Sequence, residues 1–227
     1  MVTAGVVELP PSIEVLSLQE TSITSHQFHR IKHKFPQLKT LYLSALKKLV
    51  PTSRLPPSLQ KLSLHPGHVP DERKRFMYND KCLEDIGLLR HLTRLNLFHV
   101  NLSNEGMRKL KDLGLVSLQI VGGMFEDEGL AFLPASLVSL RVSRAKGVTD
   151  HIPSSVERLG LAKVGHVTAE GIVRFLRASN APRLQLVVEK TMQSALLAVP
   201  EFPGARVHLS TDKHLFYERG GCGLYYC

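Results

Sequence analysis

A short apolar pattern recurs along the chain, and this repetition restricts the fold more than any other feature of the sequence. The pattern is apolar-x-x-apolar-x-apolar, as in Leu92, Leu95 and Leu97 of LTRLNL. Successive copies begin 19 to 25 residues apart, except for one step of 33 residues. Eight copies begin at Ile13, Leu38, Leu59, Leu92, Leu115, Leu137, Val156 and Ala181, and a degraded ninth contains Val207 and Leu209. Such a period indicates stacked copies of one supersecondary unit.

Each unit has to combine a strand with a return segment. The final apolar-x-apolar of the pattern predicts a short strand whose alternate side chains face a core. The rest of the unit returns along the other side as a helix or an irregular turn. No unit buries both parts alone, so neighbouring units must stack. The sequence therefore predicts an α/β fold, a curved solenoid with short parallel strands on the concave side and helices or irregular turns on the convex side.

The return segments come in two styles. Helices are predicted over residues 25–35, 103–113, 126–133 and 168–179. Three of them contain polar-x-Glu-Gly-apolar, and each of these three has a Ser, Glu or Thr placed to cap the helix start. The second style is a proline just before the strand, in LPPSI, LPPSL, LPASL and IPSSV. Proline there is expected to end the return segment and to impose an extended entry into the strand.

These units resemble leucine-rich repeats over roughly residues 9 to 190. The helical style is similar to ribonuclease-inhibitor-like and F-box-associated repeats, and the proline style resembles repeats of protist proteins and some bacterial effectors. In size and style the chain also resembles short mitochondrial repeat proteins of the ATP-synthase coupling-factor-B type. The resemblance implies a binding protein rather than an enzyme. We see no F-box-like segment before the first repeat and no ligase domain after the last.

Two regions interrupt the regular spacing. The step of 33 residues contains HPGHVPDERKRFMYND, an insertion over residues 65–80 that is either a solvated loop or part of a binding site. We expect one repeat domain of about eight units over residues 1–190 and a capping segment over 191–227. In that segment TMQSALLAV predicts a helix and ARVHLS a strand, and the last dozen residues are either mobile or docked on a partner. The first strand is expected to be covered by a partner or by preceding sequence.

Composition and charge restrict the location and the partners. The formal net charge is +9 and the isoelectric point about 9.6, which favours an acidic protein surface, a nucleic acid or an anionic membrane as partner. No apolar run reaches the length of a spanning helix, and the N-terminal residues lack the pattern of a secretory signal. Three cysteines, Cys82, Cys222 and Cys227, are too few for a disulfide framework. We therefore predict an intracellular protein, cytoplasmic or mitochondrial, with no membrane span.

The sequence offers no constellation that supports catalysis. It contains no phosphate-binding loop, nucleophile elbow or dinucleotide fingerprint. His26, His29 and His33 share one helix face, opposite the apolar Phe28, Ile31 and Phe35, and are interpreted as a basic solvated face rather than a metal site. Cys222 and Cys227 have no third ligand nearby that would complete a metal knuckle. We expect no catalytic residue, no metal, no cofactor and no small-molecule substrate.

The candidate binding surface follows from the alternation within the strands. The third, fifth and seventh positions of each unit point away from the core, and these 24 positions contain five Lys or Arg and no Asp or Glu. Arg144 and Lys163 lie one residue further along and extend the same side. Two aromatic side chains, Tyr42 and Phe98, are plausible anchors for a protein interface. The predicted partner-binding residues are Tyr42, Lys61, Arg94, Phe98, Arg141, Arg144, Arg158, Lys163 and Arg183.

The repeat and the basic face together favour a non-catalytic adaptor or structural subunit of a larger intracellular assembly. Its expected partner is a protein with an acidic surface. Two alternatives stay open at this point. One is an RNA-contacting subunit of a ribonucleoprotein such as a mitochondrial ribosome, for which basic side chains would contact phosphates. The other is the substrate-recognition part of a ubiquitin ligase.

Overall fold

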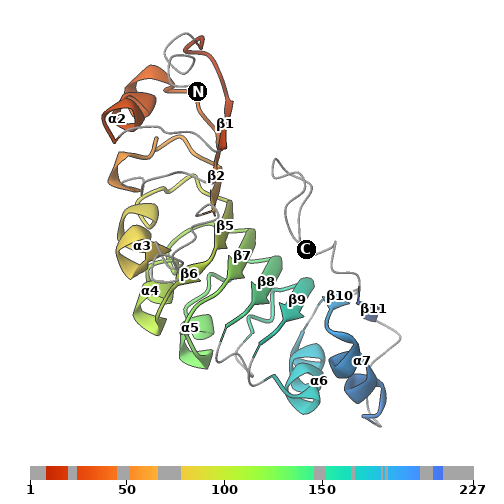
Figure 1. Cartoon of the computed structure of the whole chain (residues 1–227). Helices are drawn as coiled ribbons and strands as arrows, with labels where there is room; N and C mark the ends of the chain where they lie inside the picture. The colour runs from red at the N-terminus through yellow and green to blue at the C-terminus, as the bar shows by residue number, and fades with distance from the viewer. Residues whose placement is uncertain are drawn as a thin grey trace.

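The computed structural model of this chain describes residues 9–19, 25–44, 52–65, 78–145, 152–164, 167–179, 181, 184–199 and 207–211. These residues form a parallel β-sheet with helices packed along one side of it. The elements follow an arc, with the strands along its inner side and the helices along its outer side (Figure 1). The predicted α/β class with parallel strands is confirmed.

The sheet is built from strands that pair in chain order. Every strand pairing within it is parallel. Tyr78–Asn79 (β4) and Val100–Asn101 (β6) form a second, two-stranded sheet that is also parallel. In order, the nine strands of the main sheet are β1 (Val15–Gln19), β2 (Thr40–Ser44), β3 (Lys61–His65), β5 (Arg94–Phe98), β7 (Ser117–Val121), β8 (Ser139–Ser143), β9 (Arg158–Ala162), β10 (Leu184–Val187) and β11 (Val207–Ser210).

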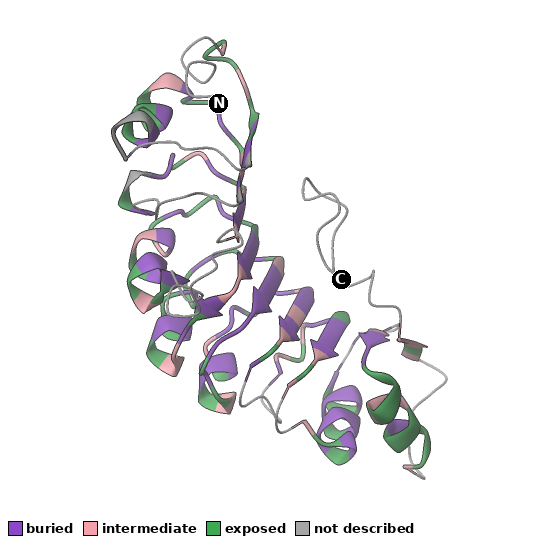
Figure 2. Cartoon of the chain, in the orientation of Figure 1, coloured by how far each residue is buried: buried purple, intermediate pink, exposed green. Residues whose placement is uncertain are grey.

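The apolar positions of the repeated pattern form the core. The register places equivalent leucines side by side, so that Leu62 lies opposite Leu95 and Leu95 opposite Leu118. These three side chains are fully buried. Figure 2 shows the buried residues along the strands and on the sheet-facing sides of the helices. Burial of each leucine contributes about 1.5–3 kcal/mol, and the stack therefore accounts for much of the stability.

Along the chain, the helices come between successive strands of the main sheet. Residues 25–35 and 168–179 were predicted as helices, and the structure has helices there. Over residues 103–113 the helix is shorter than predicted, and turns follow it. A helix after the insertion was not predicted, because its apolar residues span only two turns. The helices are α2 (Ser25–Lys34), α3 (Asp80–Ile86), α4 (Asn104–Arg108), α5 (Asp127–Ala131), α6 (Ala169–Ala178) and α7 (Lys190–Leu197), with a short 3-10 helix at Thr52–Arg54.

Helix α2 tests the prediction about the histidine-rich segment. Phe28, Ile31 and Phe35 are buried, with at most 1% of each side chain exposed. His29 and His33 are exposed and pack edge to face, with ring centroids 5.4 Å apart. The outward orientation is confirmed for these two histidines, while the side chain of His26 lies outside the described residues.

The helix starts explain the Glu-Gly motif. Ser103 and Thr168 cap their helices as predicted, because their hydroxyl oxygens accept hydrogen bonds from Gly106 N at 3.4 Å and Gly171 N at 3.0 Å. Glu126 was expected to cap α5, but its side chain makes no such bond. A Cβ on Gly106 would lie 2.0 Å from the Asp80 carboxylate. Gly106 therefore lets the start of α4 approach the preceding unit.

The proline segments form one recurring turn. In all four, the proline carbonyl accepts a hydrogen bond from the first residue of the repeated pattern, at 3.4, 3.3, 3.0 and 3.1 Å. The serine just before that residue bonds to the preceding unit in two cases: Ser58 Oγ donates to Leu38 O and Ser136 Oγ to Leu115 O, both at 2.8 Å. Ser155 occupies the same place, but its buried hydroxyl finds no partner among the described residues.

Some predictions concern residues that the structure does not describe. Residues 66–77 of the insertion, the end of the chain after residue 211, Cys222 and Cys227 lie outside the described ranges. The described part of the predicted capping segment forms α7 and β11, and β11 pairs with β10. None of the helices in the described ranges has the length and apolar character needed to cross a membrane.

Candidate partner-binding surface

The outward-pointing positions of the main sheet form a surface that we call the open face. Its residues are the third, fifth and seventh positions of the repeated pattern, together with the residues that follow β5, β7, β8 and β9, namely His99, Gly122, Arg144 and Lys163. The strand register brings these positions into rows. Lys61 on β3 lies opposite Arg94 on β5, and Arg158 on β9 lies opposite Ser139 on β8. Eight of the nine predicted binding residues lie on this face.

Exposure differs between the edges and the middle of the open face. Arg94 and Arg158, at the amino-terminal ends of their strands, are exposed, as are Arg144 and Lys163 at the carboxyl-terminal ends. The side chains in the middle of the face are more enclosed, and several are buried although polar. Arg141 is half-buried, and the buried polar residues are Ser63, Asn96, Gln119 and Ser139. A partner would therefore meet cations mainly along the two edges.

Both predicted aromatic anchors already contact cationic or imidazole groups of the protein. The Lys61 ammonium lies 5.4 Å from the centre of the Tyr42 ring, a distance at which a cation is attracted to an aromatic face. Phe98 packs against His65 with ring centroids 5.2 Å apart, and His65 also meets His99 edge to face at 5.5 Å. The Tyr42 and Phe98 rings therefore pack against neighbouring side chains of the open face, and these contacts cover part of their apolar surface.

The residue after each of four successive strands has a left-handed backbone. The φ angles are 51° at His99, 99° at Gly122, 56° at Arg144 and 52° at Lys163. This conformation lets the chain leave the strand while its N–H still bonds to the next unit: Gly122 N donates to Ser143 O at 2.8 Å and Arg144 N to Ala162 O at 3.0 Å. It is unfavourable by roughly 1–2 kcal/mol for residues other than glycine. Sequence reasoning missed this row, because only one of its members is glycine.

The last predicted unit is aligned differently from our prediction. In the sheet Gln185 lies opposite Arg158, and Gln185 N donates to Glu157 O at 2.8 Å. Gln185, Val187 and Glu189 therefore take the third, fifth and seventh positions. Arg183 was placed in the third position by sequence, but the register gives this position to Gln185, and the structure of Arg183 itself lies outside the described residues.

The new alignment also corrects the charge count of the open face. Four Lys or Arg remain at the third, fifth and seventh positions, and one acid, Glu189, joins them. The Glu189 carboxylate accepts a hydrogen bond from Lys163 N at 2.9 Å, in place of the backbone carbonyl used by the preceding strands. The open face is still predominantly basic, but the predicted absence of acidic residues is wrong.

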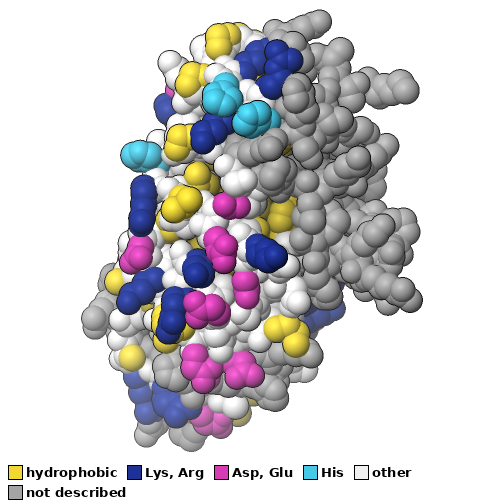
Figure 3. Space-filling view, turned by 90° about the vertical axis from the view of Figure 1, so that its left-hand side faces the viewer, with side chains coloured by type: hydrophobic (Ala, Val, Ile, Leu, Met, Phe, Trp, Pro, Cys, Tyr) yellow, Lys and Arg dark blue, Asp and Glu magenta, His cyan; other side chains and the backbone are white. Residues whose placement is uncertain are grey.

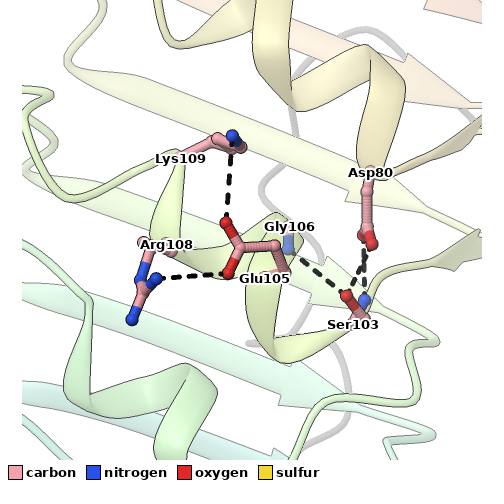
Figure 4. Close-up of polar contacts among 6 residues, drawn as sticks. All are labelled: Asp80, Ser103, Glu105, Gly106, Arg108 and Lys109. Carbon is pink, nitrogen blue, oxygen red and sulfur yellow. Dashed lines mark hydrogen bonds and ion pairs between the residues drawn. The ribbon is translucent and has the colours of Figure 1, made fainter.

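The helix side of the sheet has a different polar pattern. Acidic and basic side chains are intermingled over its middle part, and basic and histidine side chains predominate toward the top of the view (Figure 3). Around α4, Ser103 N donates to Asp80 Oδ1 at 2.9 Å, and Glu105 pairs with Arg108 at 3.4 Å and Lys109 at 3.9 Å (Figure 4). One step further, Glu126 N donates to Asn104 Oδ1 at 2.7 Å. The hydrogen bonds to Asp80 and Asn104 link neighbouring units, whereas the ion pairs of Glu105 lie along a single helix.

A cysteine on α3 is chemically protected. Cys82 is buried, with 7% of the residue exposed. Burial, together with the nearby Asp80 and Asp85 carboxylates, raises the pKa of the Cys82 thiol to about 12, and burial is the largest of these causes. The thiol is therefore protonated at neutral pH and acts as part of the core.

The structure gathers the predicted binding residues into two groups. Tyr42, Lys61 and Arg94 lie on β2, β3 and β5, whereas the remaining basic residues, Arg141, Arg144, Arg158 and Lys163, surround β8 and β9. Among the described residues, no three His, Cys, Asp or Glu side chains are grouped so as to hold a metal ion. No protein-family model matches this chain, and no curated protein matches its sequence.

Proposed function

We propose that this chain is a leucine-rich-repeat solenoid. Three observations support the proposal. The apolar pattern recurs with the period of such repeats, its strands pair in parallel and in chain order, and the patterned leucines are buried in a single core. Each unit then supplies one strand to the inner side and one return segment to the outer side, and stacking stabilises both.

We further propose that the solenoid is a non-catalytic adaptor or structural subunit that binds an acidic protein surface through its open face. The observation that carries this proposal is the distribution of charge. Arg94, Arg144, Arg158 and Lys163 are exposed on the open face, whereas the acidic residues of α3, α4 and α5 lie on the helix side. Complementary charge on a partner would steer association and fix its orientation.

A second candidate is an RNA-contacting subunit of a ribonucleoprotein. Helix α2 supports it, because His29, Arg30, Lys32 and His33 are exposed and the helix carries no acid in its first turn. Such a surface would suit phosphate contacts within a larger particle. The ubiquitin-ligase alternative and the intracellular location stay predictions from the sequence.

Crosslinked capture of the tagged full chain from cells tests both candidates. The capture is done at low and high ionic strength, with and without ribonuclease. The adaptor proposal expects a few defined acidic proteins that survive ribonuclease and are lost with the double variant Arg94→Glu and Arg158→Glu. The control is Lys81→Glu with Lys111→Glu, which makes the same charge change on the helix side.

Each alternative predicts a different outcome of the same experiment. Partners that disappear with ribonuclease would support the RNA-contacting candidate. Partners that persist equally with the Arg94 and Arg158 variant would contradict binding through the open face. Recovery of ubiquitin-ligase subunits would favour the substrate-receptor alternative.

A further inference from the structure

Four cations surround the two adjacent strands β8 and β9, and we call them the β8–β9 patch: Arg141, Arg144, Arg158 and Lys163. Across the strands, Arg158 lies opposite Ser139 and Arg141 opposite Gly160. Arg158 and Arg141 therefore each lie opposite a small residue, which leaves room for their long side chains over the sheet. Ser143 and Ala162, also small and opposite each other, separate the patch into two pairs.

We propose that the β8–β9 patch binds an extended acidic peptide segment that runs along the two strands, a proposal that rests on binding through the open face. In the first pair, Arg158 occupies the third position of its unit and Arg141 the fifth position of its own. The midpoint of this pair is therefore level with the fourth position of the repeated pattern. The second pair, Arg144 and Lys163, lies at the eighth position. Four residues of strand span about 13 Å.

An extended peptide reproduces this spacing. Its side chains alternate between two sides, so residues i and i+4 point the same way and lie about 13 Å apart. Glutamates at these positions would each meet one pair of cations. Arginine suits such contacts, since its planar guanidinium binds carboxylates through two parallel hydrogen bonds.

The protein itself leaves much of the patch uncompensated. Among the described residues, none forms an ion pair with Arg144, Arg158 or Lys163. Two acids lie close by: Glu157 precedes Arg158, and Glu189 accepts the Lys163 N–H at 2.9 Å. Against these two acids, the three exposed cations Arg144, Arg158 and Lys163 leave an excess of positive charge among the described residues.

The backbone supplies independent support. Arg144 and Lys163 have left-handed φ angles of 56° and 52°, and Gly122 occupies the equivalent position after β7, one strand before Arg144 and two strands before Lys163. Glycine would suit this conformation better. Two neighbouring members of this row are thus strained cations, and strained residues cluster at functional sites.

A peptide fits the patch better than a single-stranded nucleic acid. Binding of single strands without base pairing relies on aromatic side chains that stack on bases. The aromatic residues of the open face lie on β2 and β5, where the Tyr42 ring already meets Lys61 and the Phe98 ring meets His65. None of the described residues of β8 and β9 is aromatic.

Fluorescence anisotropy with two labelled peptides tests the proposal. The probe GTETVTETG has glutamates four residues apart, and GTEETVTTG has the same composition with adjacent glutamates. At low ionic strength we expect the full chain to bind the first peptide more tightly. In the double variant Arg144→Gln and Lys163→Gln, Kd for the first peptide should rise about three- to tenfold, the effect of losing two solvent-exposed charge contacts. The preference between peptides should also disappear.

Three comparisons make the result specific. Lys81→Gln with Lys111→Gln removes the same charge from the helix side and should change both affinities little. Arg144→Lys with Lys163→Arg keeps the charges and should keep the peptide preference. Thermal melting of every variant verifies that it is folded.

The outcomes separate this inference from the proposed function. Equal binding of the two peptides by the unmodified chain would overturn the inference. The inference would also be overturned if the double variant Lys61→Gln and Arg94→Gln lost peptide binding while the patch variant kept it. Binding through the open face would still be supported by that result. Tighter binding of an oligouridine probe, lost in the patch variant, would replace the peptide with a nucleic acid. Capture that is insensitive to Arg94→Glu and Arg158→Glu would reject the proposed function itself.

Discussion

The two sides of the main sheet use polar residues in opposite ways. On the helix side, Asp80 bonds to Ser103 and Asn104 bonds to Glu126, so polar groups connect one unit to the next. On the open face, Arg94, Arg144, Arg158 and Lys163 extend into solvent without an ion-pair partner among the described residues. We infer that helix-side polar groups contribute to stability, whereas open-face charges contribute to binding. Substitutions on the two sides should therefore separate these two properties.

The largest expected effect comes from the leucine stack beneath both sides. Leu95→Ala should lower the free energy of unfolding by about 2–5 kcal/mol, because it leaves a cavity between Leu62 and Leu118. Urea denaturation followed by circular dichroism measures the loss. A change below about 1 kcal/mol would mean that the stack repacks easily, and that the core is not the common support of the two sides.

Substitutions at two residues with a left-handed backbone, Gly122 and Lys163, should change the free energy of unfolding in opposite directions. A Cβ on Gly122 would lie 2.7 Å from Val100 O, so Gly122→Ala should lower the free energy of unfolding by about 1–3 kcal/mol. Lys163→Gly should raise it by about 0.5–1 kcal/mol, since glycine relieves the backbone strain but has more freedom when unfolded. Denaturant unfolding of both variants measures this. Destabilisation by Lys163→Gly would show that the cation itself stabilises the fold.

Asp80 tests whether helix-side contacts hold the units together. Its carboxylate accepts hydrogen bonds from Ser103 N at 2.9 Å and Ser103 Oγ at 2.5 Å. Asp80→Ala should lower the free energy of unfolding by about 1–3 kcal/mol, because a half-buried N–H loses its acceptor. Glu84→Ala, an exposed position on the same helix, is the control and should change it by less than about 0.5 kcal/mol. Equal effects of the two variants would contradict this role of Asp80.

Two serines in equivalent turns provide a smaller test. Ser136→Ala removes the bond to Leu115 O and should lower the free energy of unfolding by about 0.5–1.5 kcal/mol. Ser155→Ala removes a buried hydroxyl that has no partner among the described residues, so it should be neutral or slightly stabilising. Chemical denaturation of the two variants measures the difference. A substantial loss at Ser155 would indicate a bonding partner for its hydroxyl.

The smallest effect on stability should accompany a large effect on binding. Arg94→Glu with Arg158→Glu changes two exposed side chains, and the free energy of unfolding should change by less than about 0.5 kcal/mol. Partner capture should nevertheless fail, because both charges are reversed. If the variant unfolds more easily and still captures its partners, the division between the two sides is wrong.

The sequence predicted the features that depend on burial. The leucine pattern located most of the strands, since a buried position tolerates few residue types and recurs with the period of the fold. Helices α2 and α6 were predicted because each has a long apolar face. The alignment of β10 was not, since Ala181, Leu184 and Leu186 match the full pattern, whereas in the observed register Leu186 and Val188 take its fourth and sixth positions and the charged Arg183 falls at the apolar first position.

The candidate surface was predicted in outline but not in its details. Alternation along the strands identified its rows, and Lys61 and Arg94 are adjacent as expected. Alternation alone could not predict that Asn96 and Gln119 are buried, because their exposure depends on how closely neighbouring strands and side chains enclose them. Nor could it predict the left-handed backbone at Arg144 and Lys163, because most residue types that favour it are small or polar and uncharged.

Pairing of the main strands in chain order has a consequence for how the molecule opens. Among the described residues, each strand of the main sheet pairs only with the strands before and after it in the sheet order, so unfolding can begin at β1 or β11 without disturbing the middle. Amide hydrogen exchange should then be fastest in these end strands and slowest around β5 and β7. A partner that contacts several strands would make these strands unfold together. Its binding should therefore slow amide hydrogen exchange even in strands far from its contacts.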